Sequence, residues 1–413
     1  MRFFVETYGC TMNFGEGRFL AEDMASLGHE PASSAEEADL IILNTCTVVE
    51  TTEKKMLSRI SELKKQGKEV VVTGCMAKVQ PKRVSIRLPG SIIIPPDSYD
   101  GFRNAILERY GSTGQCLTID VGNDAILPIA QGCLGNCSYC ITKFARGDLC
   151  SYSEEDLLKK YDSFLKRDAK EILITAQDTS SYGRDIGTDL PHLLGSMLQR
   201  EGDYRIRLGM TNPDSLMHVW EGVAETMDDE RMYRFVHIPV QSGSNEVLKS
   251  MRRKYTVERF YQLVDDLRSA VPDISIATDL ICGFPGETDE DHQKSMDLIR
   301  TLRADTVNIT RFSARPGTDA ALMKQVHGRI SAERSAELTK LKNDTELDVN
   351  EAMVGHTYRA LATEYGKEGT IFRTNNYRPV VIRSTIPLGT FLDVEVTENR
   401  PTYLLGKIPS SDQ

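Results

Sequence analysis

The chain has 413 residues, of which 40% are hydrophobic and 27% are charged, a composition typical of a soluble globular protein with more than one core. Its formal net charge of −10 argues against a protein that coats nucleic acid through bulk electrostatics, but it leaves room for a local basic patch. We see no signal peptide in the opening MRFFVETYGC and no run of the ~20 apolar residues that a membrane span needs, so we expect a cytoplasmic protein with no membrane partner.

The first part of the chain alternates predicted strands with predicted helices. The strands are expected at residues 2–8, 39–44 and 69–73, and the helices at residues 15–27 and 52–66. Such alternation predicts a parallel α/β sheet of flavodoxin-like type over residues 1–115. A loop-like stretch, residues 111–123, is the expected domain boundary.

The middle of the chain contains six short apolar runs separated mostly by helical patterns. The runs are residues 126–130, 171–175, 205–209, 235–238, 274–280 and 306–311, and helices are expected at 154–166, 257–270 and 289–303. Six β/α units are fewer than the eight of a closed TIM barrel. We therefore predict a partial, TIM-like (β/α)6 barrel over residues 126–352.

A charged helix at residues 331–350 leads into a region without helical periodicity. Five β-like runs, residues 356–362, 370–373, 380–384, 390–397 and 403–408, predict a small OB-like β-barrel over residues 353–413. Basic and aromatic residues alternate in it: Arg359, Arg373, Arg378, Arg383, Arg400 and Lys407 with Tyr358, Phe372, Tyr377 and Tyr403. This pattern suits RNA. Neighbouring acidic residues offset the charge, so an ordinary exposed strand surface explains the pattern equally well.

The strongest chemical signal is a CxxxCxxC loop directly after the first strand of the predicted barrel. Its three thiols, Cys133, Cys137 and Cys140, can bind three irons of a [4Fe–4S] cluster and leave the fourth iron open. An open iron can bind the amino and carboxylate groups of S-adenosylmethionine (SAM), so we predict a radical SAM site. The alternatives are an ordinary loop with thiols and a zinc knuckle, for which Cys150 is the nearest fourth ligand.

Three further cysteines, Cys10, Cys46 and Cys75, each fall at or just after the end of a predicted parallel strand. The carboxyl ends of such strands converge on one edge of the sheet, where ligands normally bind. We predict a second three-cysteine cluster with an open iron, against the alternative of three buried structural cysteines. The same reasoning places the CxxxCxxC loop at the C-terminal face of its barrel, so the two clusters are expected to face each other.

Other residues at the predicted active face are candidates for binding SAM. Tyr139 is expected beside the adenine, and Gly283 and Gly286 lie in a loop after a barrel strand, where a tight turn is an equal explanation. Gln177 and Gln241, with neighbouring Asp178 and Ser242, supply polar groups. The cysteines without a partner pattern are expected to be inert: Cys116, Cys150 and Cys282.

This layout of two cysteine triads and a terminal β-barrel resembles the radical SAM methylthiotransferases along essentially the whole chain. Further matching segments are residues 8–13, 145–147, 237–243 and 283–287. The resemblance implies a C-terminal TRAM domain, SAM and two [4Fe–4S] clusters, one generating a radical from SAM and one holding the sulfur donor. It also implies transfer of a methylthio group to C2 of an N6-modified adenosine beside the tRNA anticodon, or to a ribosomal-protein aspartate. A flavodoxin- or ferredoxin-like electron donor and a sulfur source would be partners.

The segment after the cluster loop favours one branch of that family. Ser151-Tyr152 stands where bacterial members usually have Ser-Arg, and Thr142-Lys143 precedes Ala-Arg-Gly. Both features resemble the archaeal and eukaryotic branch, which acts on N6-threonylcarbamoyladenosine at position 37, and they put isopentenyladenosine in doubt. For tRNA we expect a basic face that includes Lys64, Lys65, Lys78, Lys82 and Arg83, although helix solvation explains these residues equally well. A non-catalytic two-cluster electron carrier and a zinc-dependent RNA-binding module remain alternatives of other classes.

Overall fold

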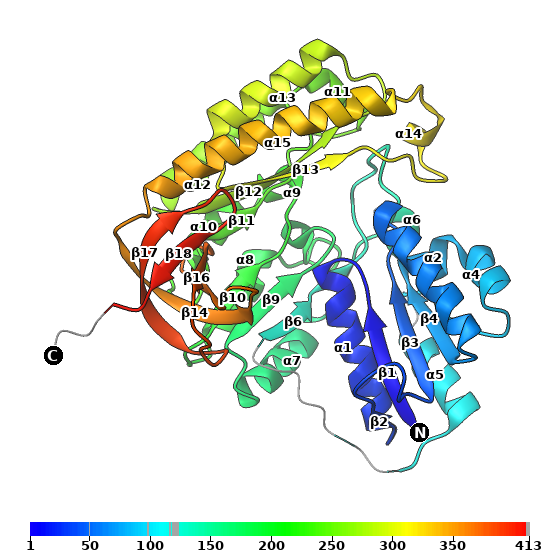
Figure 1. Ribbon diagram of the computed structural model, residues 1–413. Coiled ribbons are helices and arrows are strands. Elements are labelled where there is room, and N and C mark those ends of the chain that lie inside the picture. The colour runs from blue at the N-terminus through cyan, green and yellow to red at the C-terminus, as the bar shows by residue number, and fades with distance from the viewer. Residues whose placement is uncertain (49, 97–98, 115–116, 118–123, 410–413) are drawn as a thin grey trace.

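The computed structural model describes residues 1–48, 50–96, 99–114, 117 and 124–409. Figure 1 shows an N-terminal α/β region, a curved middle region and a small C-terminal barrel. Cys116 and most of the predicted linker 111–123 lie outside the described residues. No helix in the described part of the chain is long and apolar enough to cross a membrane.

The N-terminal region is a parallel sheet with helices on both faces. Its strands are β1 (Arg2–Thr7), β2 (Glu30–Pro31), β3 (Leu40–Thr45), β4 (Glu69–Gly74) and β5 (Ile92–Ile93), in the order β2-β1-β3-β4-β5. All four pairings are parallel. This order is that of flavodoxin-like folds, which confirms the predicted class.

Two hydrophobic cores flank this sheet. Helices α1 (Thr11–Ser26) and α5 (Tyr99–Tyr110) pack on one face, and α2 (Glu50–Lys65), α3 (Cys75–Val79) and α4 (Pro81–Arg87) pack on the other. Helix α1 begins four residues earlier than predicted, because Cys10, in extended conformation, is its N-cap. The short elements β2, β5, α3 and α4 were not predicted, since none is long enough to show a period.

The middle region is an open barrel of six parallel strands, as predicted. These are β6 (Asp124–Pro128), β9 (Glu171–Thr175), β10 (Arg205–Leu208), β11 (Phe235–His237), β12 (Ser275–Cys282) and β13 (Thr306–Arg311). They form two three-stranded parallel sheets, β6-β9-β10 and β11-β12-β13. Parallel bridges from Ile206 to Met232 and from Met210 to His237 join the two sheets.

Helices cover the outside of this barrel and bury its main core. The longer ones are α7 (Glu154–Lys166), α8 (Leu190–Leu198), α10 (Trp220–Thr226), α12 (Val257–Ala270), α13 (Asp289–Leu302) and α15 (Gly328–Glu351). Shorter elements lie in the loops: β7 (Ala130–Gln131), α6 (Thr142–Arg146), β8 (Cys150–Ser151), η1 (Thr179–Ser181), α9 (Pro213–Leu216), α11 (Asn245–Ser250) and α14 (Asp319–Leu322).

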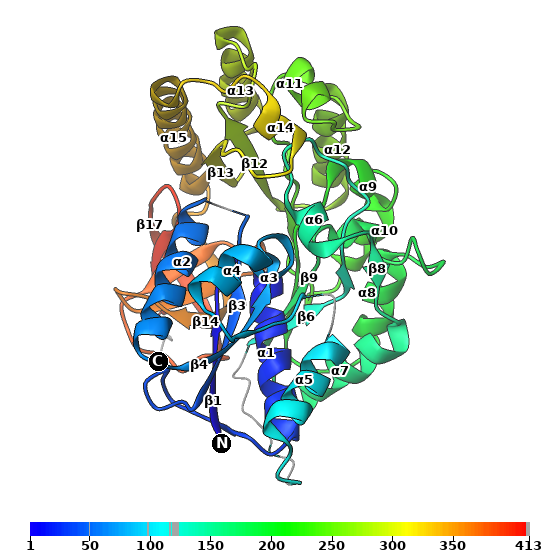
Figure 2. The ribbon, with the colours of Figure 1, turned by 90° about the vertical axis from the view of Figure 1, so that its right-hand side faces the viewer.

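Helix α1 joins the N-terminal region to the edge of the barrel. It packs against β6, and Figure 2 shows it between the N-terminal sheet and that strand. Gly15 permits this approach, because a Cβ there would lie only 2.7 Å from Cγ2 of Ile126. Farther along α1, Glu22 pairs with Lys160 and with Arg167 of the barrel.

The C-terminal region is a closed five-stranded barrel, which confirms the OB-like prediction. Its strands are β14 (Thr357–Tyr365), β15 (Thr370–Thr374), β16 (Pro379–Ile382), β17 (Phe391–Asn399) and β18 (Leu404–Lys407), closed in the order β14-β15-β16-β18-β17.

Two side chains that we expected to face RNA are buried instead. Phe372 fills the core of the C-terminal barrel. Arg378 is buried against the middle region, with its Nη1 2.8 Å from Oδ1 of Asp305. These residues stabilise the barrel and its docking, because a β-like sequence pattern does not say which face of a small barrel is covered.

Candidate active site

The three N-terminal cysteines gather at the carboxyl edge of the sheet. Cys10 follows β1, Cys46 follows β3, and Cys75 begins α3 directly after β4; these three strands are neighbours. The pKa of the Cys75 thiol is raised to about 11, mainly by burial and also by the nearby thiols of Cys46 and Cys10, while the charge of Arg146 acts in the opposite direction. A Cβ on Gly9 would lie 2.8 Å from Cβ of Cys46, so the Cys10 loop passes directly over Cys46.

Backbone geometry and one amide side chain hold these loops together. Gly74 precedes Cys75 with φ +83°, and a Cβ there would overlap the carbonyl oxygen of Thr45. A side chain at this position would therefore be both strained and obstructed. The Nδ2 of Asn13 donates to the carbonyl oxygens of Tyr8 and Thr45, at 2.8 and 3.1 Å. Asn13 thus ties the Cys10 loop to the Cys46 loop.

The CxxxCxxC loop wraps around its own sulfurs. The backbone N–H of Gly135 donates to Sγ of Cys133 at 3.2 Å. A Cβ on Gly135 would lie 3.2 Å from that sulfur and 3.7 Å from Sγ of Cys137. The pKa of the Cys133 thiol is raised to about 11, mainly by burial and also by Asp178, Cys140 and Cys137, while the hydrogen bond from Gly135 lowers it. The loop therefore brings its thiols and one backbone donor to a common centre.

Both triads have the donor chemistry that an iron–sulfur cluster requires. Cluster irons take thiolate ligands, and a bound metal deprotonates a coordinating thiol even where burial has raised its pKa. Within the described ranges, no group of three or more His, Cys, Asp or Glu is spaced to hold a single metal ion. In a cubane each thiolate binds a different iron, so the ligands stand farther apart than those of one ion.

Arg146 connects the segments that carry the two triads. It lies on α6, just after the CxxxCxxC loop, and α6 packs against α3. Its Nη2 donates to Oδ1 of Asn13 and Oε2 of Glu16, both at 2.8 Å, and its positive charge lowers the pKa of the Cys75 thiol. Arg146 and Glu16 are both buried. Arg146 therefore ties the segment just after the CxxxCxxC loop to the helix that follows Cys10.

A second arginine of the middle region contacts the Cys46 loop. Arg315 donates from Nε to the carbonyl oxygen of Val48 and from Nη1 to Oε2 of Glu53, both at 3.1 Å. The hydroxyl of Thr47, next to Cys46, donates to the same Glu53 oxygen at 2.8 Å. Two buried arginines thus hold the loops of the N-terminal triad against the middle region. Neither was named as a site residue from the sequence, although Arg146 lies in the matching segment 145–147.

Arg253 contacts a sulfur of the CxxxCxxC loop and was not named by the sequence analysis. Its Nη1 donates to Sγ of Cys137 at 3.2 Å, and its other nitrogens donate to the Tyr255 hydroxyl and to Oδ1 of Asn212, at 2.9 and 3.0 Å. Burial opposes the charged form of Arg253, but its neighbours, among them Tyr255, Tyr139 and Cys137, raise its pKa. A fixed positive charge therefore lies beside the CxxxCxxC loop.

The two glutamines lie at the carboxyl ends of barrel strands. Oε1 of Gln177, after β9, accepts a hydrogen bond from the backbone N–H of Gly132 at 2.7 Å, so it supports the start of the CxxxCxxC loop. Gln241, after β11, has φ +75°, a conformation that non-glycine residues rarely adopt. Its backbone is held by hydrogen bonds with Asp279 and Ile281. Such strain is often retained at ligand sites.

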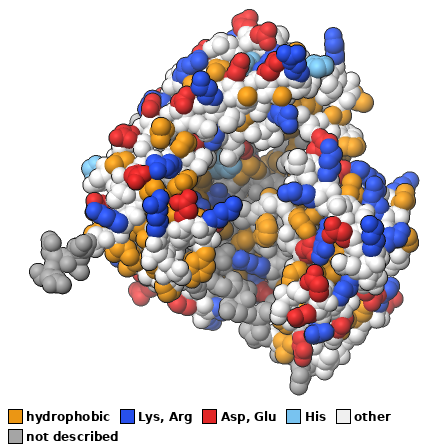
Figure 3. Space-filling model, in the orientation of Figure 1, with side chains coloured by type: hydrophobic (Ala, Val, Ile, Leu, Met, Phe, Trp, Pro, Cys, Tyr) orange, Lys and Arg blue, Asp and Glu red, His pale blue; other side chains and the backbone are white. Residues whose placement is uncertain are grey.

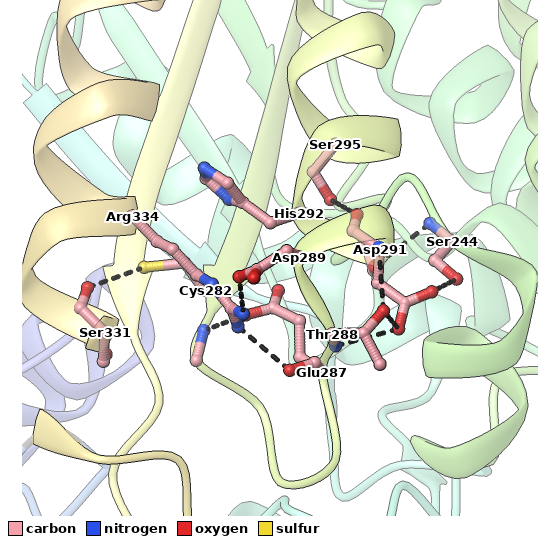
Figure 4. A network of polar contacts seen from close by, with 12 residues as sticks. Ser244, Cys282, Glu287, Thr288, Asp289, Asp291, His292, Ser295, Ser331 and Arg334 are labelled. Carbon is pink, nitrogen blue, oxygen red and sulfur yellow. Dashed lines mark hydrogen bonds and ion pairs between the residues drawn. The ribbon is translucent and has the colours of Figure 1, made fainter.

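The loop with Gly283 and Gly286 is held by hydrogen bonds to Glu287, and its Phe284 ring packs against the CxxxCxxC loop. Oε2 of buried Glu287 accepts bonds from the N–H of Gly283, at 2.6 Å, and from Nη1 of Arg334, at 2.8 Å (Figure 4). A Cβ on Gly283 would lie 2.5 Å from Oγ of Ser331 on α15. Between the glycines, Phe284 packs edge-on against Tyr139, with ring centroids 6.2 Å apart. The loop thus reaches the CxxxCxxC loop through Phe284.

The remaining described cysteines lie apart from this arrangement. Cys150 is exposed in β8. Cys282 is buried at the end of β12, where its thiol donates weakly to the carbonyl oxygen of Ser331 at 3.9 Å.

Comparisons with known proteins agree with these three regions. Residues 2–94 match the Uncharacterized protein family UPF0004, residues 127–299 match the Radical SAM superfamily, and residues 351–408 match the TRAM domain. Among solved structures, a radical SAM methyltransferase from Kitasatospora setae, TsrM, whose structure contains cobalamin and a [4Fe–4S] cluster, has a TM-score of 0.56 at 14% identity. The match covers 78% of this chain and 76% of that one, and supports the fold alone.

Curated relatives match the whole chain. A probable threonylcarbamoyladenosine tRNA methylthiotransferase from Pyrococcus abyssi is 38% identical over 99% of this chain and 100% of its own length. The threonylcarbamoyladenosine tRNA methylthiotransferase from Homo sapiens is 32% identical over 100% of this chain and 74% of its own length. The resemblance inferred from the cysteine layout is thereby confirmed: the chain belongs to the threonylcarbamoyladenosine tRNA methylthiotransferase family.

Proposed function

We propose that this protein attaches a methylthio group to C2 of N6-threonylcarbamoyladenosine at position 37 of tRNA. The observation that supports the proposal is the packing of α6, which follows the CxxxCxxC loop, against α3, which begins at Cys75, with buried Arg146 of α6 bonded to Asn13 and Glu16. When bound, SAM and the cluster on one triad supply a radical able to abstract hydrogen from an unactivated C–H bond, and the other cluster supplies sulfur. SAM also supplies the methyl group.

The chain's own residues hold and shield these groups. Cys133, Cys137 and Cys140 are the proposed ligands of the SAM-binding cluster, and Cys10, Cys46 and Cys75 are those of the second. Around the first triad, Arg253 and the N–H of Gly135 each donate to a ligand sulfur, which favours the anionic cluster.

The adenosyl part of SAM requires a site next to the CxxxCxxC loop. We assign Tyr139, with Phe284 behind it, to the adenine, because the two rings pack together beside the loop. Gln177, Gln241, Gly283 and Gly286 border the same end of the barrel. They position the loop and the cofactor by backbone and amide contacts.

Regions 1–115, 126–352 and 353–413 then correspond to the second-cluster domain, the radical SAM domain and the TRAM domain. The TRAM domain would contact tRNA through the basic residues that remain exposed, such as Arg359 and Arg383, and the compartment is the cytoplasm. We infer two further partners, a flavodoxin- or ferredoxin-like electron donor and a source of sulfur, because the reaction consumes electrons and sulfur. The relatives do not favour a ribosomal-protein aspartate or isopentenyladenosine as the substrate.

The test is the nucleoside composition of tRNA from cells with and without the gene, measured by mass spectrometry. We expect 2-methylthio-N6-threonylcarbamoyladenosine only when the gene is present, and unmodified N6-threonylcarbamoyladenosine to accumulate without it. Reconstituted protein should perform the same conversion anaerobically with SAM and reductant. If the reconstituted protein modified only ribosomal protein, or only isopentenyladenosine, the proposed substrate would be wrong.

A further inference from the structure

The inner face of the barrel carries a different set of side chains from its helix-covered face. On β10, Ile206 and Leu208 belong to the main core under the helices, so Arg207 between them points inward. On β11 and β12 the same alternation turns Phe235 and Ala277 inward, where they form a small cluster with Tyr233 and with Tyr377 of the C-terminal barrel. Figure 3 shows that the molecule is hollowed between the barrel and the N-terminal region.

Arg207 is a cation on this inner face, and no acidic residue of the described part of the chain pairs with it. Its guanidinium carbon lies 5.2 Å from the ring centroid of Phe235 and 5.4 Å from that of Tyr377. It makes no hydrogen bond or ion pair with any residue that the structure describes, and its Nε is buried without an acceptor. Ring contacts satisfy the faces of a guanidinium, but they leave its N–H donors open.

The charged neighbours of Arg207 already have partners. Arg373 stacks on the same Tyr377 ring but donates to Oε1 of Glu364 at 3.1 Å. Asp279, also on the inner face, has its Oδ1 2.8 Å from Nε2 of His237 and accepts from Nδ2 of Asn308 at 2.9 Å. A buried donor left unsatisfied is costly, and a ligand that supplies the missing acceptor is one way in which a protein recovers that cost.

Arg207 also lies below the carboxyl end of the barrel strands, at a depth that suits contact with a substrate rather than with a cluster. It is in register with Leu173 of β9, two residues before that strand ends at Thr175. At roughly 3.3 Å per residue, Arg207 is about 7 Å below the active end of the barrel. A nucleobase held at that end could direct a substituent toward it.

We propose that Arg207 binds the carboxylate at the end of the N6-threonylcarbamoyl group and thereby selects this substrate. The inference rests on the proposed function. A guanidinium binds a carboxylate through two parallel N–H···O bonds, and the match is strongest away from bulk water. An isopentenyl group is apolar and would leave the same donors unsatisfied.

The experiment compares two anticodon stem-loop RNAs, one with N6-threonylcarbamoyladenosine and one with its methyl ester, in anaerobic assays of reconstituted enzyme. The native enzyme should have a kcat/KM for the acid roughly 10- to 100-fold above that for the ester, as expected for a charge-assisted hydrogen bond. Arg207→Met should lose this preference while processing the ester like the native enzyme. Arg207→Lys, which keeps the charge without the planar fork, should be intermediate.

Arg373→Met is the matched control, because it removes the other guanidinium stacked on Tyr377. It should change kcat/KM for acid and ester by the same factor. The inference is overturned if Arg207→Met keeps the acid preference, if it slows both RNAs equally, or if it weakens SAM binding instead. The first of these outcomes would refute the role of Arg207 and leave the proposed function standing. Absence of native activity on the acid RNA would refute the proposed function as well.

Discussion

Replacing Arg146 with methionine should destabilise the junction between the N-terminal region and the barrel. The change leaves Glu16 buried without a cation and removes a donor from Asn13. Breaking one partner of a buried ion pair costs about 3–5 kcal/mol. Urea denaturation of the cluster-free protein, followed by circular dichroism, should show a loss of this size in the free energy of unfolding. Arg167→Met is the control at the same interface; it should cost less than about 1 kcal/mol, since Arg167 is partly exposed and its partner Glu22 retains Lys160.

Adding Glu16→Leu to Arg146→Met should recover at least about 2 kcal/mol, because apolar residues often replace a buried ion pair without loss. In the reconstituted enzyme, Arg146→Met should still cleave SAM, whose proposed site does not include Arg146, but should insert sulfur slowly. A double variant no more stable than Arg146→Met would refute the ion-pair reasoning. Equal loss of SAM cleavage and sulfur insertion would refute the role of Arg146 in joining the two triads.

Two other substitutions test the surroundings of each triad. Gly74→Ala combines a positive φ with an overlap on Thr45, so it should displace Cys75 and lower the iron content of reconstituted protein from about eight to about four atoms per chain. Gly67→Ala, at φ +66° with open space around the Cβ, should keep all the iron, and equal iron in both variants would contradict the argument. Arg253→Met removes a charged donor from Sγ of Cys137 and should lower the reduction potential of the SAM-binding cluster by roughly 40 mV, if the bond is about 1 kcal/mol stronger to the reduced cluster. Arg253→Lys should restore part of the potential, measured by redox titration with electron paramagnetic resonance, and an unchanged potential in Arg253→Met would refute the electrostatic role.

The architecture and the cysteines were predictable because their signals are local. A buried apolar run ending in cysteine fixes both the strand and the position of its thiol, and parallel pairing then brings Cys10, Cys46 and Cys75 to one edge. The six barrel strands were predictable because each is a short apolar run in the sequence. The start of α1 was missed, since Cys10 caps the helix without a side-chain hydrogen bond.

The contacts that join the regions could not be read from the sequence. Arg146 lies 130 residues from Glu16, Arg253 lies 116 residues from Cys137, and Arg315 lies 262 residues from Glu53. No periodic pattern links positions so far apart, and a single arginine in the sequence resembles any solvated residue. For the same reason the inward orientation of Arg207 and the burial of Arg378 emerge only from the fold.

The most direct test of the two-triad account compares Cys46→Ala with Cys137→Ala in one anaerobic assay. Cys46→Ala should still form 5′-deoxyadenosine from SAM, contain about four irons per chain and leave N6-threonylcarbamoyladenosine RNA without sulfur. Cys137→Ala should form no 5′-deoxyadenosine. If Cys46→Ala methylthiolated the RNA at the native rate, the second triad would not be the site of sulfur insertion and the account would be wrong.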